Sequence, residues 1–261
     1  MFTASQRAFV GTCVALFAAS AALTIQWCSS MSAMHDMPMP GGWNMSMMWM
    51  RMPGQTWPGI ATAFVGMWLV MMIAMMLPAL VPMLWRYRRA NALASHAHIG
   101  ALTTLVGAAY FFVWTLFGAV AFLAAAILTS IEMQLPLLAR SVPAAIGVVV
   151  LVSGLLQFSG WKAHHLACCR AMPDCCESMR ADVRAAWRHG VRLGLHCVHC
   201  CFGLTTLLLV VGVMDLRAMA LVTAAISVER LAPSGVRAAR FIGAILVVAG
   251  LFLTVQAAVG W

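Results

Sequence analysis

This chain contains a series of long apolar runs with almost no charged residues, and these runs limit the folds that it can adopt. About 20 apolar residues, each rising about 1.5 Å along a helix, cross a hydrocarbon layer that is about 30 Å thick. Only 9% of the residues are charged, against about 25% in an ordinary soluble domain. Lipid offers no partner to exposed backbone groups, so spanning segments must be helical. We expect an all-α, polytopic transmembrane helical bundle that forms a single membrane domain over residues 1–261.

The apolar runs divide into about six to seven expected spans. Their expected ranges are 8–27, 58–84, 99–129, 142–160, 194–213, 216–229 and 240–260. The sixth is the weakest, because Arg217 and Glu229 bracket only eleven residues. The first resembles a signal peptide, but its apolar core is longer than is usual for one and no small-x-small cleavage site follows it. We therefore expect it to be a retained anchor.

The basic residues are distributed unequally between the two sides of this bundle. With seven spans, 13 of the 16 Lys and Arg residues fall on one side. The positive-inside rule then places the N-terminus in the cytoplasm and the C-terminus outside the cytoplasmic, or inner, membrane. The net charge of +9 is explained by basic inner loops, so no nucleic acid partner is needed.

The expected outer loop, residues 28–57, is rich in methionine. It contains nine methionines and one histidine between residues 31 and 52, and these are candidate metal ligands: Met31, Met34, His35, Met37, Met39, Met45, Met47, Met48, Met50 and Met52. A thioether is a soft ligand that suits Cu(I), and it has no proton to lose on binding. The Pro and Gly residues argue for an irregular loop. The alternative is an apolar loop at the membrane interface, with Trp43, Trp49 and Trp57 in the aromatic belt.

A second cluster lies in the expected cytoplasmic loop, residues 161–193, and at the inner edge of the fifth span. The candidate ligands are His165, Cys168, Cys169, Cys175, Cys176, His196, Cys197, His199, Cys200 and Cys201. On a helix, Cys197, Cys200 and Cys201 share one face, and we expect His196 and His199 to share the neighbouring face with Cys200. In a reducing cytosol, such cysteines favour metal or redox chemistry over structural disulfides. Thiolate and imidazole ligands suit Cu(I), with Zn(II) as the alternative.

For two other groups of sulfur-containing residues, packing in the core is an alternative to metal binding. Cys13 stands alone in the first span, which favours its packing as a small buried hydrophobe. The second span contains a methionine stripe with four candidate ligands: Met71, Met72, Met75 and Met76. Helical methionine stripes are more often packing than ligands, so both interpretations of this stripe stay open.

Several segments resemble the DUF2182 family, which is described as predicted metal-binding integral membrane proteins. The resemblance covers most of residues 58–235. It rests on Trp68 to Pro78, on Gln157-Phe158 with Trp161-Lys162 and Cys169-Arg170, on Gly194 to Cys201, on Gly212 to Leu216, and on Glu229-Arg230. It implies a membrane protein that binds metal, but names no reaction. The chain departs from the family pattern at His165, where the family has Cys, and at His199, where it has Gly.

These patterns lead to one functional hypothesis and two alternatives. We expect a Cu(I)-binding membrane protein that acquires or transports copper, collecting the ion on outer methionines and holding it at an inner Cys/His site. The alternatives are a membrane thiol oxidoreductase and a metal sensor or metalloenzyme assembly factor that moves no ion. No nucleophile–His–Asp set or phosphate loop is present in the sequence, so we do not expect an enzyme. The expected partners are the lipid bilayer, copper, and a copper chaperone or metalloenzyme.

Overall fold

The computed structural model describes residues 4–32, 37–39, 43–45, 56–91, 96–171 and 182–259. Within these ranges the chain forms eight helices and one short hairpin. Their bounds are α1 Ala4–Ser32, β1 Met37–Met39, β2 Trp43–Met45, α2 Trp57–Ala90, α3 His96–Gln134, α4 Pro136–Leu156, α5 Gly160–Ala171, α6 Val183–Val211, α7 Leu216–Leu231 and α8 Gly235–Val259. The expected all-α, polytopic helical bundle is confirmed.

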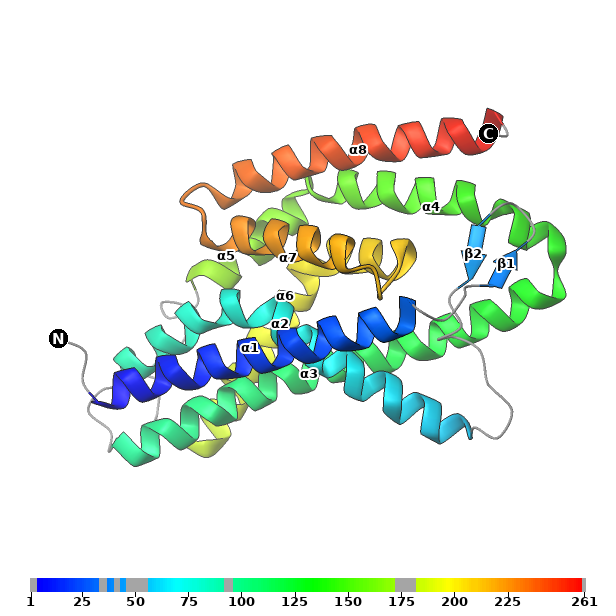
Figure 1. The fold of residues 1–261 in the computed structure, drawn as a ribbon. Coiled ribbons are helices and arrows are strands. Elements are labelled where there is room, and N and C mark those ends of the chain that lie inside the picture. Colours follow the sequence, from blue (N-terminus) through cyan, green and yellow to red (C-terminus); the bar gives the residue numbers. More distant parts are fainter. Residues whose placement is uncertain are drawn as a thin grey trace.

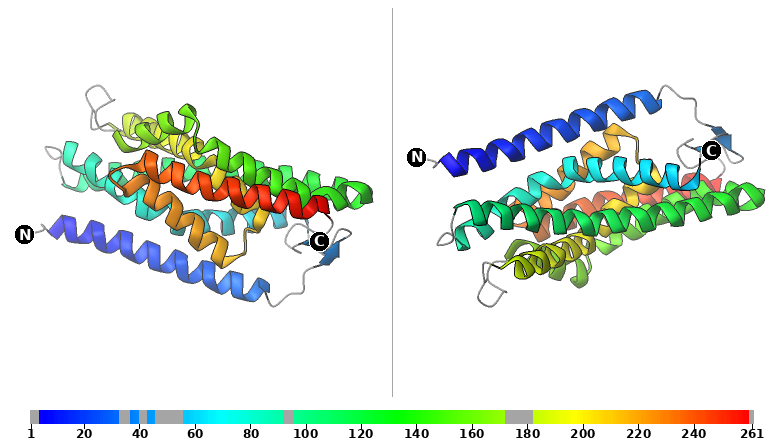
Figure 2. Two further views of the ribbon diagram at one scale, coloured as in Figure 1. Left: turned by 90° about the horizontal axis from the view of Figure 1, so that it is seen from above. Right: turned by 90° about the horizontal axis from the view of Figure 1, so that it is seen from below.

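The helices run roughly along one common direction (Figure 1), and α1 lies at the edge of the bundle, where it packs mainly on α2 (Figure 2). The helix α3 packs along α6 and α2, while α4 packs along α8. The helix α1 begins at one end of the bundle and α8 ends at the other (Figure 1). The core lies between α2, α3, α6 and α7, where the largest fully buried side chains include Trp68, Trp114 and Ile226.

Five helices, α1, α2, α3, α6 and α8, are long and apolar enough to cross a membrane. The helices α4 and α5 meet at a bend of 63° and count as a sixth span if they are taken together. The helix α7 has only 16 residues and does not qualify, in keeping with its weak signal in the sequence. Many apolar side chains of α3 and α8 face outward, such as Val120 and Phe252. An outward apolar face is what lipid contact requires.

Two expectations for the loops need correction. Part of the methionine-rich segment is an antiparallel hairpin, in which Met37 pairs with Met45 and Met39 with Trp43, so it is not irregular throughout.

Residues 161–193 are mostly helical where the structure describes them, since α5 extends to Ala171 and α6 already begins at Val183. The helix α6 begins earlier than expected because its first turns are amphipathic. Arg184, Arg188 and Arg192 are at i, i+4 and i+8, so they lie on one face of the helix, and all three are exposed.

Local signals in the sequence place α5 and α6 against their neighbours. Ser159 accepts a hydrogen bond from the backbone N–H of Lys162, which caps the start of α5 after the bend. Gly190 and Gly194 of α6 face α3 so closely that a Cβ at either position would collide with Val106 or Val113. These two glycines let the α6 and α3 backbones approach each other, and this approach sets the depth of the cysteines that follow.

Candidate metal centre

Four thiols gather in the core, three from α6 and one from α5. The Sγ atoms of Cys200 and Cys201 are 3.5 Å apart, and those of Cys197 and Cys201 are 3.9 Å apart. Cys169 of α5 adds a fourth sulfur, 3.7 Å from that of Cys200. Cys197, Cys200 and Cys201 have ligand atoms that all lie within 4.8 Å of one another. The four side chains are at most 1% exposed. We call Cys169, Cys197, Cys200 and Cys201 the thiol cluster.

The thiol cluster is deeper in the protein than expected. It was predicted at the inner edge of a span that begins near residue 194, but it lies in the middle of α6, because that helix begins at Val183. The prediction that Cys197, Cys200 and Cys201 share a helical face is confirmed.

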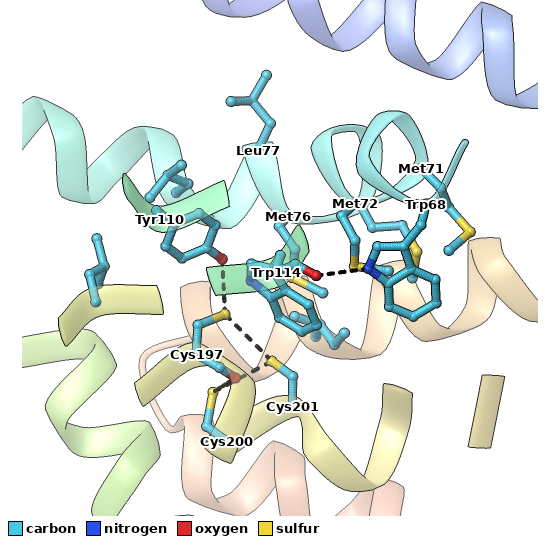
Figure 3. Close-up of a cluster of buried hydrophobic side chains, with 14 of the residues drawn as sticks. Trp68, Met71, Met72, Met76, Leu77, Tyr110, Trp114, Cys197, Cys200 and Cys201 are labelled. Atoms are coloured by element: carbon cyan, nitrogen blue, oxygen red, sulfur yellow. Dashed lines mark hydrogen bonds between the residues drawn. The ribbon is translucent and has the colours of Figure 1, made fainter. Parts of the chain in front are cut away.

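Two polar side chains from other helices meet the sulfur of Cys197. The Tyr110 hydroxyl of α3 donates a hydrogen bond to it over 2.9 Å, as Figure 3 shows. The Arg230 guanidinium of α7 donates a second one over 3.2 Å. A guanidinium carries a permanent positive charge, and a cation beside a thiol favours the thiolate, which is the form that binds metals.

Arg230 is in an unusual position for a charged side chain. It is only 5% exposed, and its Nε and one terminal nitrogen find no acceptor. No carboxylate in the described part of the chain forms an ion pair with it. A buried charge is normally paired, because an unpaired one is costly. The thiol cluster, which this guanidinium contacts at Cys197, can supply the missing negative charge.

Lys162 of α5 and Glu229 of α7 form a buried ion pair next to Cys200. Their Nζ and Oε2 atoms are 2.7 Å apart, and Lys162 also donates to the backbone carbonyl of Cys200. Arg170 of α5 donates to the backbone carbonyl of Glu229 over 3.0 Å. These contacts hold α5, α6 and α7 together around the sulfurs.

The methionine stripe of α2 belongs to the same buried core as the thiol cluster. Met71, Met72, Met75 and Met76 are at most 3% exposed, and Figure 3 shows Met72 and Met76 in the same part of the bundle as the thiols. Trp68 of this helix donates to the Trp114 carbonyl of α3 over 3.0 Å. The stripe therefore packs in the core, and its thioethers supply further soft atoms there.

The predicted histidine ligands are separated from the thiols. His199 was expected to share a face with Cys200, but it is exposed while Cys200 is buried. His196 is half-buried and meets His165 of α5, with 3.1 Å between their Nδ1 atoms. Successive residues of a helix are turned by about 100° from one another, which places the imidazoles on the outer side of α6.

Other predicted ligands are only partly described or lie outside the described residues. Met34, His35, Met47, Met48, Met50, Met52, Cys175 and Cys176 lie outside them. For Met31, Met37, Met39 and Met45 the structure describes the backbone alone. Cys168 is half-buried, with its sulfur 3.7 Å from His164 Nε2. Cys13 is buried in α1 as expected.

Sequence reasoning missed the polar residues that surround the sulfurs. Tyr110, Lys162 and Arg230 were not identified as parts of a site. One signal was available, because ionisable groups inside apolar helices are costly and are usually functional. Tyr110 and Arg230 are 120 residues apart in the sequence, however, and only the packing of α3 and α7 against α6 brings both to Cys197.

The chemistry of this site suits a metal cation that prefers sulfur ligands. Thiolates bind both Cu(I) and Zn(II), and two thiolates around a monovalent ion leave one net negative charge, which Arg230 can balance. The buried, largely apolar surroundings exclude competing water ligands.

A family model described as PpoB2, copper chaperone, matches residues 65–253. This range contains the thiol cluster, the α2 methionines and Arg230, and it leaves out α1 and the methionine-rich segment. The match does not test the resemblance to DUF2182, which stays a prediction. No curated protein and no solved structure matches the chain significantly.

Proposed function

Because this chain belongs to the PpoB2 copper chaperone family, we propose that it binds Cu(I) at the thiol cluster and hands it on within the membrane. The observation that carries the proposal is the unpaired Arg230 guanidinium beside Cys197. A neutral thiol cluster would leave this buried cation without a counter-charge. An anionic copper–thiolate centre supplies that charge.

Soft methionine sulfur offers a route for copper to reach the thiol cluster. The outer segment, residues 28–57, collects Cu(I) on thioethers, and Met72 and Met76 carry soft ligands into the core. Thioethers bind without losing a proton, so they are weaker and less pH-dependent ligands than thiolates. Copper then moves inward, from weak thioether sites to strong thiolate sites. This direction assumes that the N-terminus lies in the cytoplasm and that the chain resides in the inner membrane.

Replacement of single cysteines tests the thiol site. The purified protein in detergent is loaded with Cu(I) under reducing conditions and equilibrated with a chromophoric Cu(I) chelator. We expect Cys169→Ser, Cys197→Ser, Cys200→Ser and Cys201→Ser each to reduce the copper that the protein retains. Cys13→Ser is the matched control, because Cys13 is also buried but lies in α1 away from the thiol cluster.

Equal losses in all five variants would indicate general misfolding and contradict a specific site. Full copper retention by the four cluster variants would exclude the thiol site. Rapid formation of a disulfide in the cluster, with no tight copper, would favour the thiol oxidoreductase instead.

Movement of copper across the bilayer needs a separate experiment. Proteoliposomes that contain a Cu(I) chelator should take up Cu(I) faster than vesicles without protein, and Met72→Leu with Met76→Leu should slow this uptake. Binding without uptake above the protein-free rate would contradict transport and leave a chaperone or assembly factor that moves no ion across the membrane.

A further inference from the structure

A cavity of about 520 Å³ lies between α1, α2 and α3, and none of the four thiols of the thiol cluster lines it. Sites for small molecules have volumes of about 300–1,000 Å³, so this cavity has room for a ligand. Gly100 and Gly107 of α3 line it, and a Cβ added at either position would meet nothing within 4 Å. The packing of the three helices therefore leaves this space open.

The cavity follows the helices inward from one end of the bundle. Figure 1 shows that α1 begins, α2 ends and α3 begins at this end. The lining extends from Ser5 to Leu16 along α1 and from Gly100 to Phe111 along α3, which is about 16 Å in each helix at about 1.5 Å per residue. One leaflet of a hydrocarbon layer of about 30 Å is about 15 Å deep. The cavity is therefore about as long as the acyl chain of a membrane lipid.

The inner part of the cavity suits an apolar chain. Leu16, Ile73 and Phe111 form its walls there. Three threonine hydroxyls in the lining donate to carbonyl oxygens of their own helices, so they require no polar partner from a ligand. These belong to Thr12, Thr103 and Thr104. An acyl chain can lie against them without leaving a buried hydroxyl donor unpaired.

Arg88 of α2 places a positive charge at the end of the cavity where α1 begins. It donates a hydrogen bond to Ser5 Oγ over 2.9 Å, and its guanidinium carbon lies 5.0 Å from the Phe9 ring centroid. No carboxylate in the described part of the chain forms an ion pair with it, and the sequences of α1 and α2 contain no Asp or Glu. Contacts with α1 thus hold a cation whose charge no acidic side chain balances.

We propose that this cavity binds an anionic phospholipid, with one acyl chain between the helices and the phosphate at Arg88. A guanidinium matches the geometry of a phosphate. The helices α1 and α3 both begin at this end, and the positive ends of their dipoles favour an anion there. Basic pockets between spanning helices are known sites for anionic headgroups.

The lipid would complete the packing of α1. This helix packs mainly on α2, and the cavity separates it from part of α3. An acyl chain in that space contacts all three helices, so it attaches α1 to the rest of the bundle. The site is separate from the thiol cluster and needs no copper.

Native mass spectrometry of the purified full-length protein in a non-ionic detergent tests the site. The protein is titrated with phosphatidylglycerol, and in parallel with phosphatidylcholine that has the same acyl chains. We expect the first phosphatidylglycerol molecule to bind more tightly than later ones, and about fivefold or more tightly than phosphatidylcholine, because one basic residue has about this effect on an anionic lipid.

Two variants test the two ends of the cavity separately. Arg88→Gln should weaken phosphatidylglycerol binding by about fivefold and leave phosphatidylcholine binding unchanged. Arg89→Gln is its matched control, because Arg89 is exposed and does not line the cavity. Gly107→Leu fills part of the inner cavity, and each CH₂ group that it excludes should weaken the binding of both lipids by about fourfold. Gly11→Leu is the control for this change, because Gly11 has open space around it but does not line the cavity.

Equal affinities for the two lipids, or equal losses in Arg88→Gln and Arg89→Gln, would overturn the phosphate site. Unchanged lipid binding in Gly107→Leu would show that the acyl chain lies elsewhere. This variant keeps Arg88, so the proposal stays testable if Arg88→Gln disturbs the contact with α1. Displacement of bound phosphatidylglycerol by an equal concentration of a neutral isoprenoid quinone would assign the cavity to the quinone and contradict the lipid.

Discussion

Among single residues, Arg230 matters most for the chemistry of the thiol cluster, because it brings a buried positive charge to the Cys197 sulfur. Its guanidinium is buried, touches the Cys197 sulfur at 3.2 Å and keeps two nitrogens without acceptors. The Tyr110 hydroxyl of α3 donates a hydrogen bond to the same sulfur. The Cys197 sulfur therefore accepts hydrogen bonds from α3 and α7, and both donors stabilise negative charge at this sulfur.

Replacement of Arg230 tests this role directly. We expect Arg230→Met to weaken Cu(I) binding by about 10–100-fold, as is typical when an outer-shell partner of a metal site is lost. Arg230→Lys keeps the charge and should weaken binding less. Competition with a Cu(I) chelator measures both, and Arg237→Met, at an exposed position of α8, is the control. A stable Arg230→Met protein with unchanged affinity would contradict the counter-charge role.

At the scale of helices, the close contact of α3 and α6 holds the thiols beside Tyr110. Gly190→Ala adds a Cβ that would collide with the Val106 carbonyl oxygen and Ala109. Overpacking of this kind costs about 1–3 kcal/mol, so we expect a lower free energy of unfolding in detergent, measured by circular dichroism. Gly107→Ala on α3 is the control, because nothing lies within 4 Å of its added Cβ. Equal stability of both variants would show that this contact tolerates extra volume.

The ion pair between α5 and α7 gives a second prediction at this scale. Lys162 and Glu229 are 5% and 1% exposed. Loss of Lys162 leaves the buried Glu229 carboxylate without its partner, so Lys162→Met alone should destabilise the protein by about 3–5 kcal/mol. The double variant Lys162→Met with Glu229→Leu should recover most of this loss, because two apolar side chains replace the pair. A double-mutant cycle on thermal unfolding in detergent measures the difference, and additive losses would contradict a coupled pair.

At the scale of the whole molecule, the unequal distribution of Arg and Lys predicts the orientation. A cysteine introduced at Ser46, in the methionine-rich segment, should react with a membrane-impermeant thiol reagent in intact cells. One introduced at Ala181, between α5 and α6, should react only after the membrane is permeabilised. Labelling is measured as the increase over the parent protein. The reverse pattern would overturn both the orientation and the inward direction of copper transfer.

Much of the architecture could be predicted from the sequence, because lipid leaves a chain few options. The apolar runs at 58–84 and 240–260 correspond to α2 and α8. The common face of Cys197, Cys200 and Cys201 followed from helical periodicity alone. The start of α6 was misplaced, because the sequence of an amphipathic helix end resembles that of a polar loop.

The long apolar runs were enough to predict a helical membrane protein, and the composition of the chain shows which residue types can bind metal ions. Which of these residues meet depends on how the helices pack. Periodicity gives the angle between two side chains on one helix, but not which neighbouring helix each one faces. The packing of α3, α5 and α7 around α6 turned the thiols toward Tyr110, Cys169 and Arg230 and left His196 and His199 outside with His165. One expected Cys/His cluster thereby became two separate groups, because close helix packing buries one side of α6 and exposes the other.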